Sequence, residues 1–377
     1  MKEELLYLWF NNIDDIGNGT RLRLLREFSS VENIYEASEK ILRNHLSDIQ
    51  VKRLIDSKKS SKYSELEQRL LERNINVLYL EKKDYPLKLC NIYNPPTILY
   101  VKGRLNKGIN SYNMNIAIVG SRKLSIYGKE ITGFFSRELS FAGINIISGM
   151  AKGVDSMAHK ASLEAGGYTV AVLGSGINVP YPLENTELYE EISKNGAVIS
   201  EYGLDVSPKP GLFPMRNRII SGLSDGVLVV EAQKKSGSLI TADCALEQGK
   251  QVYAVPGRLK DKNSEGTNNL IKSGAYLVTH PEDIIWDLKG EDNYKDMCFD
   301  AINEVDEFEE EENMVNKNFL APIEKMVYSC LSLEPKYIDD IIQFTGLGVT
   351  KTISVLFSME EKGIIKQPLK GYYIVTV

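Results

Sequence analysis

The chain has 377 residues, of which 43% are hydrophobic and 25% are charged, and its formal net charge is −6 at pH 7. This composition is ordinary for a globular protein, disfavours disorder, and leaves room for about two or three domains. No apolar run reaches the roughly 18–20 residues that cross a bilayer, and the N-terminus lacks the apolar stretch of a signal peptide, so we expect a cytoplasmic protein without membrane association.

The cysteines and histidines show no metal-binding spacing. The four cysteines (Cys90, Cys244, Cys298 and Cys330) form no CxxC pair, and the three histidines are equally scattered. Structural zinc sites and disulfide frameworks require closely organised ligands or paired cysteines. We therefore expect neither a metal site nor a disulfide framework.

The negative charge is unevenly distributed. Residues 1–111, 112–288 and 289–377 carry +4, −2 and −8, and much of the acid lies between Glu304 and Glu312. A negative total disfavours a nucleic-acid ligand when it is taken alone, because a basic footprint is the usual signature. Since one segment holds much of the acid, only local groups of charge can decide the question.

The first region, residues 1–110, begins with two helical patterns, Leu5 to Trp9 and Leu22 to Phe28. Between them, Ile16-Gly17-Asn18-Gly19-Thr20 predicts a tight hairpin, with Thr20 capping the second helix. Two interpretations stay open. One is a SAM-like or helix-hairpin-helix unit that grips a DNA backbone through its amides, and the other is a plain helix corner. We predict a helical domain over residues 1–70.

From about 112 to 288, nearly continuous β-branched runs alternate with helical patterns. The runs lie at 116–119, 144–147, 169–173, 197–199, 226–230 and 251–255. Such uninterrupted apolar runs are typical of strands buried on both faces of a parallel sheet. The alternation predicts an α/β fold, a Rossmann-like doubly wound and mainly parallel sheet, in a domain over 71–288 with its motif core at 112–280.

Residues 289–317 are predicted to form an acidic linker, because carboxylates that repel one another disfavour a packed structure. Three helical patterns at 323–331, 338–344 and 349–361 follow, and then a hairpin that ends at 371–375. This pattern predicts a winged-helix domain over 318–377. Its expected recognition helix, 350–361, carries few basic residues, which favours a protein-contact or regulatory role over duplex reading, although both stay open.

Glycine and charge collect after the predicted strands, at the edge where open α/β sheets bind ligands. Gly120-Ser121-Arg122 follows the first strand, and Ser148 to Asp155, with Lys152 and Gly153, follows the second. Ser236 to Thr241 supplies hydroxyls at a helix start after the fifth strand. Glycine turns that open helices offer amides and a positive dipole end to anions, and Arg122 and Lys152 add full charges. We therefore predict a phosphate pocket at this edge.

The segment Lys209 to Leu223 predicts a loop leading into a helix whose first turn carries Arg216, Asn217 and Arg218. Arginines at a helix start cost about a few tenths of a kcal/mol or more, so a bound anion would explain them. The alternative is salt bridges to acids such as Glu201 or Glu231. Phe213, beside these charges, could stack on a base or pack in the core.

Catalytic motifs are scarce. The turn Gly174-Ser175-Gly176 has Val179 where a dinucleotide fingerprint needs a third glycine, and no GxxxxGK[ST] loop is present, so we expect no nucleotide cofactor. Asp155 and His159 could pair across one helical turn, but a helix-start carboxylate and a packed histidine are favoured. Glu231 could act as a general base, but the sequence shows no partner for it.

Seven short motifs occur in order between about 110 and 280. They are Gly120-Ser121-Arg122, Ser148 to Asp155, Gly174-Ser175-Gly176 with Tyr181-Pro182 and Asn185, Ser200-Glu201, Phe213 to Arg218, Glu231-Ala232 with Ser236 to Ala242, and Pro256-Gly257 with Gly266 and Asn269 to Ile271. In this set the chain resembles the DprA/Smf family of DNA-processing proteins.

The resemblance implies a protein that is not an enzyme and that binds single-stranded DNA in a basic pocket of the Rossmann-like domain. It also implies a homodimer formed through that domain, protection of incoming strands in natural transformation, and loading of the RecA recombinase. By motif, the pocket residues would be Arg122, Lys152, Arg216, Asn217 and Arg218, with amide approach from Gly120, Ser121 and Gly153. Lys152 stands where many relatives have arginine, which keeps the charge but not the bidentate geometry.

Two other functions stay open. A Rossmann-like nucleotide hydrolase would use the same strand-end cradle with Glu231, although the PGGxGTxxE pattern of such enzymes is absent. A transcription regulator would instead use the predicted winged helix on duplex DNA.

Overall fold

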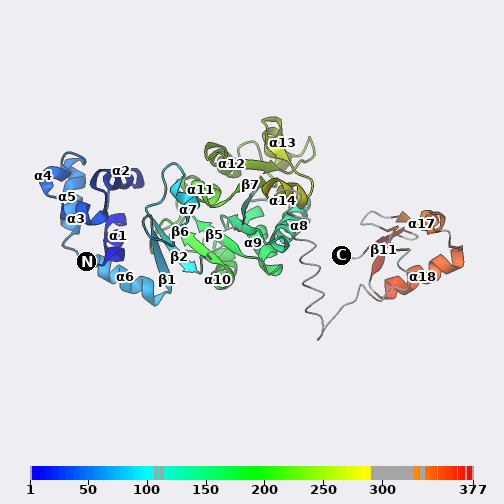
Figure 1. The fold of residues 1–377 in the computed structure, drawn as a ribbon. Helices are drawn as coiled ribbons and strands as arrows, with labels where there is room; N and C mark the ends of the chain where they lie inside the picture. The colour runs from blue at the N-terminus through cyan, green and yellow to red at the C-terminus, as the bar shows by residue number, and fades with distance from the viewer. Residues whose placement is uncertain are drawn as a thin grey trace. The chain divides into compact units, whose positions relative to one another are not determined.

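The computed structural model describes residues 2–105, 109, 114–289, 327–328, 330–331, 336–345, 347–362, 364–369 and 372–375. The chain divides into two compact units, residues 1–298 and 299–377 (Figure 1). Apart from Lys289, the predicted acidic linker lies outside the described residues. The predicted domain boundary at residue 70 stays a prediction. Among the described residues, no helix is both long and apolar enough to span a bilayer.

The first unit begins with short helices packed around their own apolar cluster, which includes Trp9, Leu24, Ile34 and Leu54. The helices are α1 (Glu3–Asn11), α2 (Asn18–Phe28), α3 (Val31–Glu36), α4 (Glu39–Leu42), α5 (Asp48–Ser57) and α6 (Lys62–Glu72). The two predicted helices are confirmed. The prediction that Thr20 caps the second helix is wrong, because α2 begins at Asn18 with Gly17 as its N-cap.

Within the described residues, the central sheet has nine strands in the order β1-β2-β6-β5-β4-β3-β7-β8-β9. They are β1 (Ile75–Tyr79), β2 (Ile98–Gly103), β3 (Asn115–Val119), β4 (Asn145–Ser148), β5 (Thr169–Leu173), β6 (Ala197–Ser200), β7 (Gly226–Val229), β8 (Gln251–Ala254) and β9 (Tyr276–Leu277). From β6 to β9 neighbouring strands are parallel, whereas β2 pairs antiparallel with both β1 and β6. The predicted strands and the mostly parallel α/β sheet are therefore confirmed.

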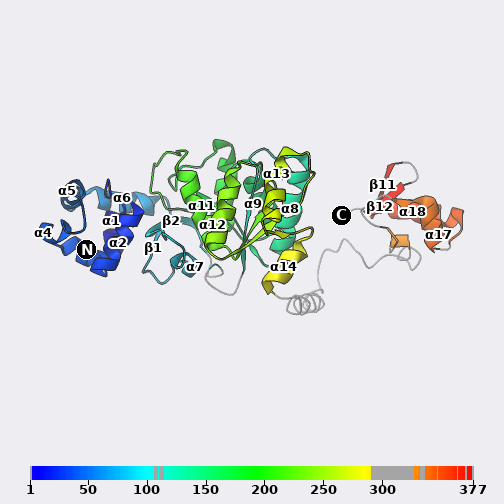
Figure 2. The same cartoon turned by 90° about the horizontal axis from the view of Figure 1, so that it is seen from above.

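Helices cover both faces of this sheet. One apolar cluster joins the sheet to α7 (Leu87–Cys90), α11 (Leu212–Leu223) and α12 (Gly237–Glu247), and α11 and α12 lie side by side (Figure 2). Other clusters join the opposite face to α8 (Ile126–Phe141), α9 (Val154–Glu164), α10 (Thr186–Asn195) and α14 (Pro281–Lys289). Helix α13 (Glu265–Lys272) precedes β9.

The strand order reverses between β3 and β7. From β3 the chain adds β4, β5 and β6 on one side, and it then returns to add β7, β8 and β9 on the other side. At such a switch point the loops after the two neighbouring strands diverge, and a crevice opens at their carboxyl ends. The topology therefore places the turn after β3 and the segment after β7 on the walls of one crevice.

The second unit contains α17 (Ile338–Thr345), α18 (Val349–Glu361) and a small antiparallel sheet. Its strands β10 (Lys336–Tyr337), β11 (Ile365–Leu369) and β12 (Tyr372–Val375) lie in the order β10-β12-β11. The predicted helices at 338–344 and 349–361 and the hairpin are confirmed. Most of the predicted helix at 323–331 lies outside the described residues, so the winged helix stays a prediction.

Candidate nucleic-acid interface

A cavity of about 640 Å³ opens at the switch point between β3 and β7. Three segments provide most of its lining: Val119 to Lys123 at the end of β3, residues of α11 between Phe213 and Ile220, and residues around the start of α12 between Gln233 and Thr241. Asp155 and Tyr181 also line it. The cavity thus lies where the topology predicts a ligand crevice.

The turn after β3 is packed tightly against its neighbours. A Cβ on Gly120 would lie 2.5 Å from Val154 Cγ2, so a larger residue would push the turn away from α9. The Ser121 hydroxyl donates to the Lys123 carbonyl at 2.9 Å and accepts from the Lys123 amide at 3.1 Å. These contacts fix the backbone that carries Arg122.

Arg122 offers an exposed positive charge at this cavity. Its guanidinium lies 5.6 Å from the ring centre of Phe213, within cation–π range. Among the described residues, no acidic side chain forms a salt bridge with Arg122. A planar guanidinium that is exposed and forms no salt bridge can donate a pair of hydrogen bonds to phosphate oxygens.

Helix α11 begins earlier than the sequence analysis predicts. Its first residue is Leu212, so Arg216 is its fifth residue and not part of the first turn. Pro214 fits inside this first turn, where its missing amide hydrogen costs no helical hydrogen bond. The predicted first-turn position of Arg216 and Arg218 is therefore wrong, and the dipole argument for an anion does not apply to them.

Arg216 instead lies buried at the cavity, with 5% of its surface exposed. Its Nη1 donates to the Gly149 carbonyl at 2.8 Å and also to the Val172 carbonyl. Neither Glu201 nor Glu231 forms a salt bridge with it among the described residues. Among acidic groups, Asp155 raises the pKa of Arg216 most strongly.

Burial shifts the pKa values of both Asp155 and Arg216. It raises the pKa of Asp155 to about 6 and lowers the pKa of Arg216 to about 10, while each charge partly offsets the shift of the other. Both groups are therefore mainly charged at pH 7. The Asp155 carboxylate also accepts the Ala151 amide at 3.3 Å and so holds the loop after β4.

Phe213 and Asn217 also lie at the cavity, as predicted site residues. The Phe213 ring lies 5.4 Å from that of Tyr181 and covers Gly174, where a Cβ would be 2.7 Å from the ring. The half-buried Phe213 therefore packs against the segment after β5 while it lines the cavity. Asn217 donates to the Gly237 carbonyl at 3.2 Å and so links α11 to the start of α12.

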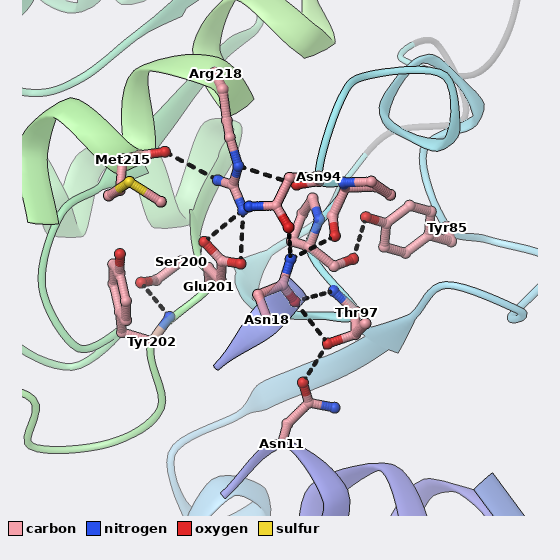
Figure 3. A network of polar contacts seen from close by, with 12 residues as sticks. Asn11, Asn18, Tyr85, Asn94, Thr97, Ser200, Glu201, Tyr202, Met215 and Arg218 are labelled. Atoms are coloured by element: carbon pink, nitrogen blue, oxygen red, sulfur yellow. Dashed lines mark hydrogen bonds and ion pairs between the residues drawn. The ribbon is translucent and has the colours of Figure 1, made fainter. Parts of the chain in front are cut away.

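Three predicted site residues do not line the cavity. Arg218 forms a salt bridge to Glu201 at 2.8 Å (Figure 3), which matches the salt-bridge alternative for this arginine. Lys152 is exposed and pairs with Glu184 at 2.6 Å. Gly153 has a φ of +87°, and a Cβ there would lie 2.2 Å from the Ser121 carbonyl oxygen. It therefore packs directly against the turn that carries Arg122.

Three polar residues that belong to none of the predicted site motifs also line the cavity, namely Lys123, Gln233 and Lys235. Lys235 directly precedes Ser236, the N-cap of α12, whose hydroxyl accepts the Ser238 amide at 3.4 Å. A basic pair between a predicted strand end and a serine-rich helix start was the signal that could have revealed Lys235.

The possible catalytic groups are engaged elsewhere. Glu231 accepts the Ser125 amide at 3.1 Å and the Asn263 side chain at 3.4 Å, so it holds the start of α8. The His159 Nδ1 contacts Thr169 Oγ1 at 2.6 Å, and burial lowers the pKa of His159 to about 3. The favoured interpretation of a packed histidine is confirmed. In the described part of the chain, no group of His, Cys, Asp and Glu could hold a metal ion.

Comparisons with known proteins agree with this architecture. Residues 76–289 match the family model described as DNA recombination-mediator protein A. The DNA processing protein DprA of Bacillus subtilis is 43% identical over 217 residues, which are 58% of this chain and 72% of that protein.

Two solved structures are also similar. DNA processing protein A from Streptococcus pneumoniae has a TM-score of 0.65 and 33% identity, over 74% of this chain and 96% of that one. DNA processing protein A from Helicobacter pylori has a TM-score of 0.52 and 32% identity, over 57% of this chain and 95% of that one. The chain therefore belongs to the family of DNA recombination-mediator protein A, that is, to the DprA/Smf proteins.

Proposed function

We propose that this protein binds single-stranded DNA at the cavity between β3 and β7, without catalysis, and acts in DNA processing during natural transformation. Family membership supports this role, and the solved structure of the Helicobacter pylori relative concerns a single-stranded DNA binding mode. The observation that carries the proposal is the exposed Arg122 guanidinium, free of salt bridges among the described residues, over the Phe213 ring at a switch-point cavity.

The cavity suits a single strand because it combines charge with aromatic surface. Arg122, Lys123 and Lys235 can contact phosphates, and the Phe213 and Tyr181 rings can stack on a base. Proteins that bind any single strand use these two contacts and do not read base edges. Gly120, Ser121, Arg216 and Asn217 complete the proposed contact set, and Lys152 joins it if DNA displaces Glu184.

The decisive experiment measures oligo-dT binding by fluorescence anisotropy at several salt concentrations. Arg122→Gln should weaken binding and reduce the slope of log K against log salt by roughly 0.7, the value for one phosphate contact on a single strand. Arg69→Gln is the matched control, because Arg69 is also an exposed arginine but pairs with Asp205 away from the cavity. An unchanged affinity and slope in Arg122→Gln would exclude this cavity as the DNA site.

We further propose that the protein loads the RecA recombinase on the bound strand and forms a homodimer through the Rossmann-like domain. The family resemblance supports both ideas. Among the described residues, β9 is also an edge strand of the sheet with Tyr276 and Leu277 exposed, and edge strands offer backbone groups to a second copy. Sedimentation of the full chain tests the dimer, and RecA filament formation on coated single strands tests the loading.

The C-terminal unit is proposed to be a winged helix that contacts protein rather than duplex DNA, within the predicted domain 318–377. Helix α18 exposes Ile353 and Phe357, and a basic surface for a major groove is lacking on its described side chains. A gel shift in which a specific duplex binds more tightly than a single strand would favour the regulator alternative. The hydrolase alternative has little support, because Glu231 is engaged at the start of α8.

A further inference from the structure

Arg218 is buried, and although it belongs to α11 it does not line the cavity. Its Nε donates to the Asn94 carbonyl at 3.0 Å and its Nη1 to the Met215 carbonyl at 3.0 Å. Its Nη2 donates to both carboxylate oxygens of Glu201, at 2.8 Å and 2.9 Å. The exposed fractions of the Arg218 and Glu201 side chains are only 11% and 13%.

This arrangement leaves Arg218 little capacity to bind a phosphate. A guanidinium has five N–H donors in a fixed plane, and four hydrogen bonds already use all three nitrogens of Arg218. The Glu201 carboxylate, in direct contact with Arg218, would also repel an approaching phosphate. Arg218 therefore differs from Arg122, whose guanidinium is exposed and forms no salt bridge among the described residues.

The polar network around Arg218 continues into the N-terminal helices (Figure 3). Asn18, the first residue of α2, donates to Asn94 Oδ1 at 2.9 Å and to the Pro95 carbonyl at 2.8 Å. The Thr97 amide and hydroxyl donate back to Asn18 Oδ1 at 3.3 Å and 3.0 Å. The loop 94–97 thus connects α2 to α11 through side-chain and carbonyl contacts.

We propose that Arg218 is a positioning residue for the single-stranded DNA site. Its pair with Glu201 and the Asn94–Asn18 contacts hold α11 against the end of β6 and against the N-terminal helices. Because α11 also carries Arg216 at the cavity, this network sets where that guanidinium lies. The inference rests on the proposed function, since it assigns a role in DNA binding to residues that do not touch DNA.

The two roles of Arg218 predict opposite effects of Glu201→Gln. If Arg218 contacts phosphate directly, removing the neighbouring negative charge strengthens DNA binding. If Arg218 positions α11, the same change loosens the helix and weakens DNA binding, even though the protein becomes less acidic. The salt slope separates the roles as well, because a positioning residue contributes no phosphate contact.

The experiment measures oligo-dT affinity and its salt slope by anisotropy for the full chain with Glu201→Gln, Arg218→Gln and Asn18→Ala. We expect each variant to bind roughly 2- to 30-fold more weakly, with the wild-type slope, as for residues that couple to a site without contacting its ligand. Glu190→Gln is the matched control. It removes the same charge from a carboxylate paired with Lys102 away from the cavity, and its affinity should equal that of the wild type.

Tighter binding by Glu201→Gln, or a slope reduced by about 0.7 in Arg218→Gln, would overturn the positioning role. If either variant fails to fold, as judged by circular dichroism, Asn18→Ala decides, and unchanged affinity in that variant overturns the proposal. The proposed function is tested separately by the wild type and Arg122→Gln. If those two behave as expected while Glu201→Gln binds more tightly, only the positioning role is lost.

Discussion

Gly153→Ala should destabilise the protein and weaken DNA binding together. Gly153 has φ +87° and ψ −126°, a conformation that residues with a side chain rarely adopt. The strain of a non-glycine residue there costs about 1–3 kcal/mol. The added Cβ would also lie 2.2 Å from the Ser121 carbonyl oxygen and 2.8 Å from the Arg122 carbonyl carbon.

The overlap with Ser121 and Arg122 adds a second cost, because these are backbone atoms and cannot rotate away as a side chain can. Overpacking of this kind adds about 1–3 kcal/mol, so the total loss is about 2–6 kcal/mol, a large part of the roughly 5–15 kcal/mol that stabilises a domain. To relieve the overlap, the Ser121–Arg122 turn must move away from α9, whose Val154 amide donates to the Ser121 carbonyl at 3.1 Å. That movement displaces Arg122 and should lower affinity for a single strand.

Urea unfolding and oligo-dT anisotropy measure the two effects. Gly143→Ala is the control, because Gly143 also has a positive φ of +71° but has nothing within 4 Å of an added Cβ. Its cost should be only the left-handed strain, about 1–2 kcal/mol, with unchanged DNA affinity. Equal destabilisation by the two substitutions would refute the argument from the Ser121 contact.

Three further predictions concern buried groups and stacking. Arg218→Met removes the salt-bridge partner of the buried Glu201, so urea unfolding should show a loss of about 3–5 kcal/mol, and a loss below about 1 kcal/mol would contradict the buried pair. Burial raises the pKa of Asp155 from 3.8 to about 6, so the folded state binds this proton more tightly than the unfolded chain does. The free energy of unfolding that this tighter proton binding contributes is fully present below about pH 4 and is lost as pH rises through 6. In unfolding measurements at a series of pH values, Asp155→Asn should abolish this loss of stability. Phe213→Leu should weaken oligo-dT binding by about 1–3 kcal/mol if the ring stacks on a base, with an unchanged salt slope, whereas full affinity would leave Phe213 a packing residue.

The sequence predicted the central strands well because burial on both faces leaves a plain signal. The run Thr169 to Leu173 is buried throughout, and its short uninterrupted apolar character is typical of a strand in a parallel sheet. Strands β1 and β2 were missed, because they pair antiparallel outside the alternation of strands and helices. A long connection, residues 80–97, separates the two strands, so the sequence shows no short turn that would predict their pairing.

The site prediction grouped Arg216 with Arg218, although helix geometry separates them. Residues two apart on an α-helix point about 200° apart, so one helix face cannot present both. The structure places Arg216 at the cavity and Arg218 against Glu201. The spacing of the two arginines could therefore have separated them wherever the helix starts, whereas the helix start itself was misplaced because Pro214 suggested a loop where the first helical turn already runs.

The net charge of −6 does not weaken the case for a polyanionic ligand. At physiological ionic strength, exposed charges more than about 8 Å apart are largely screened from one another, so affinity depends on the charges that line the cavity. There, Arg122, Lys123 and Lys235 are exposed, whereas Asp155 is buried opposite Arg216 and offsets mainly that charge. The salt-dependent part of binding should therefore come from the three exposed cations. Arg216 is already held by the Gly149 and Val172 carbonyls, so it should contribute a hydrogen-bond donor whose side chain needs no reordering when DNA binds.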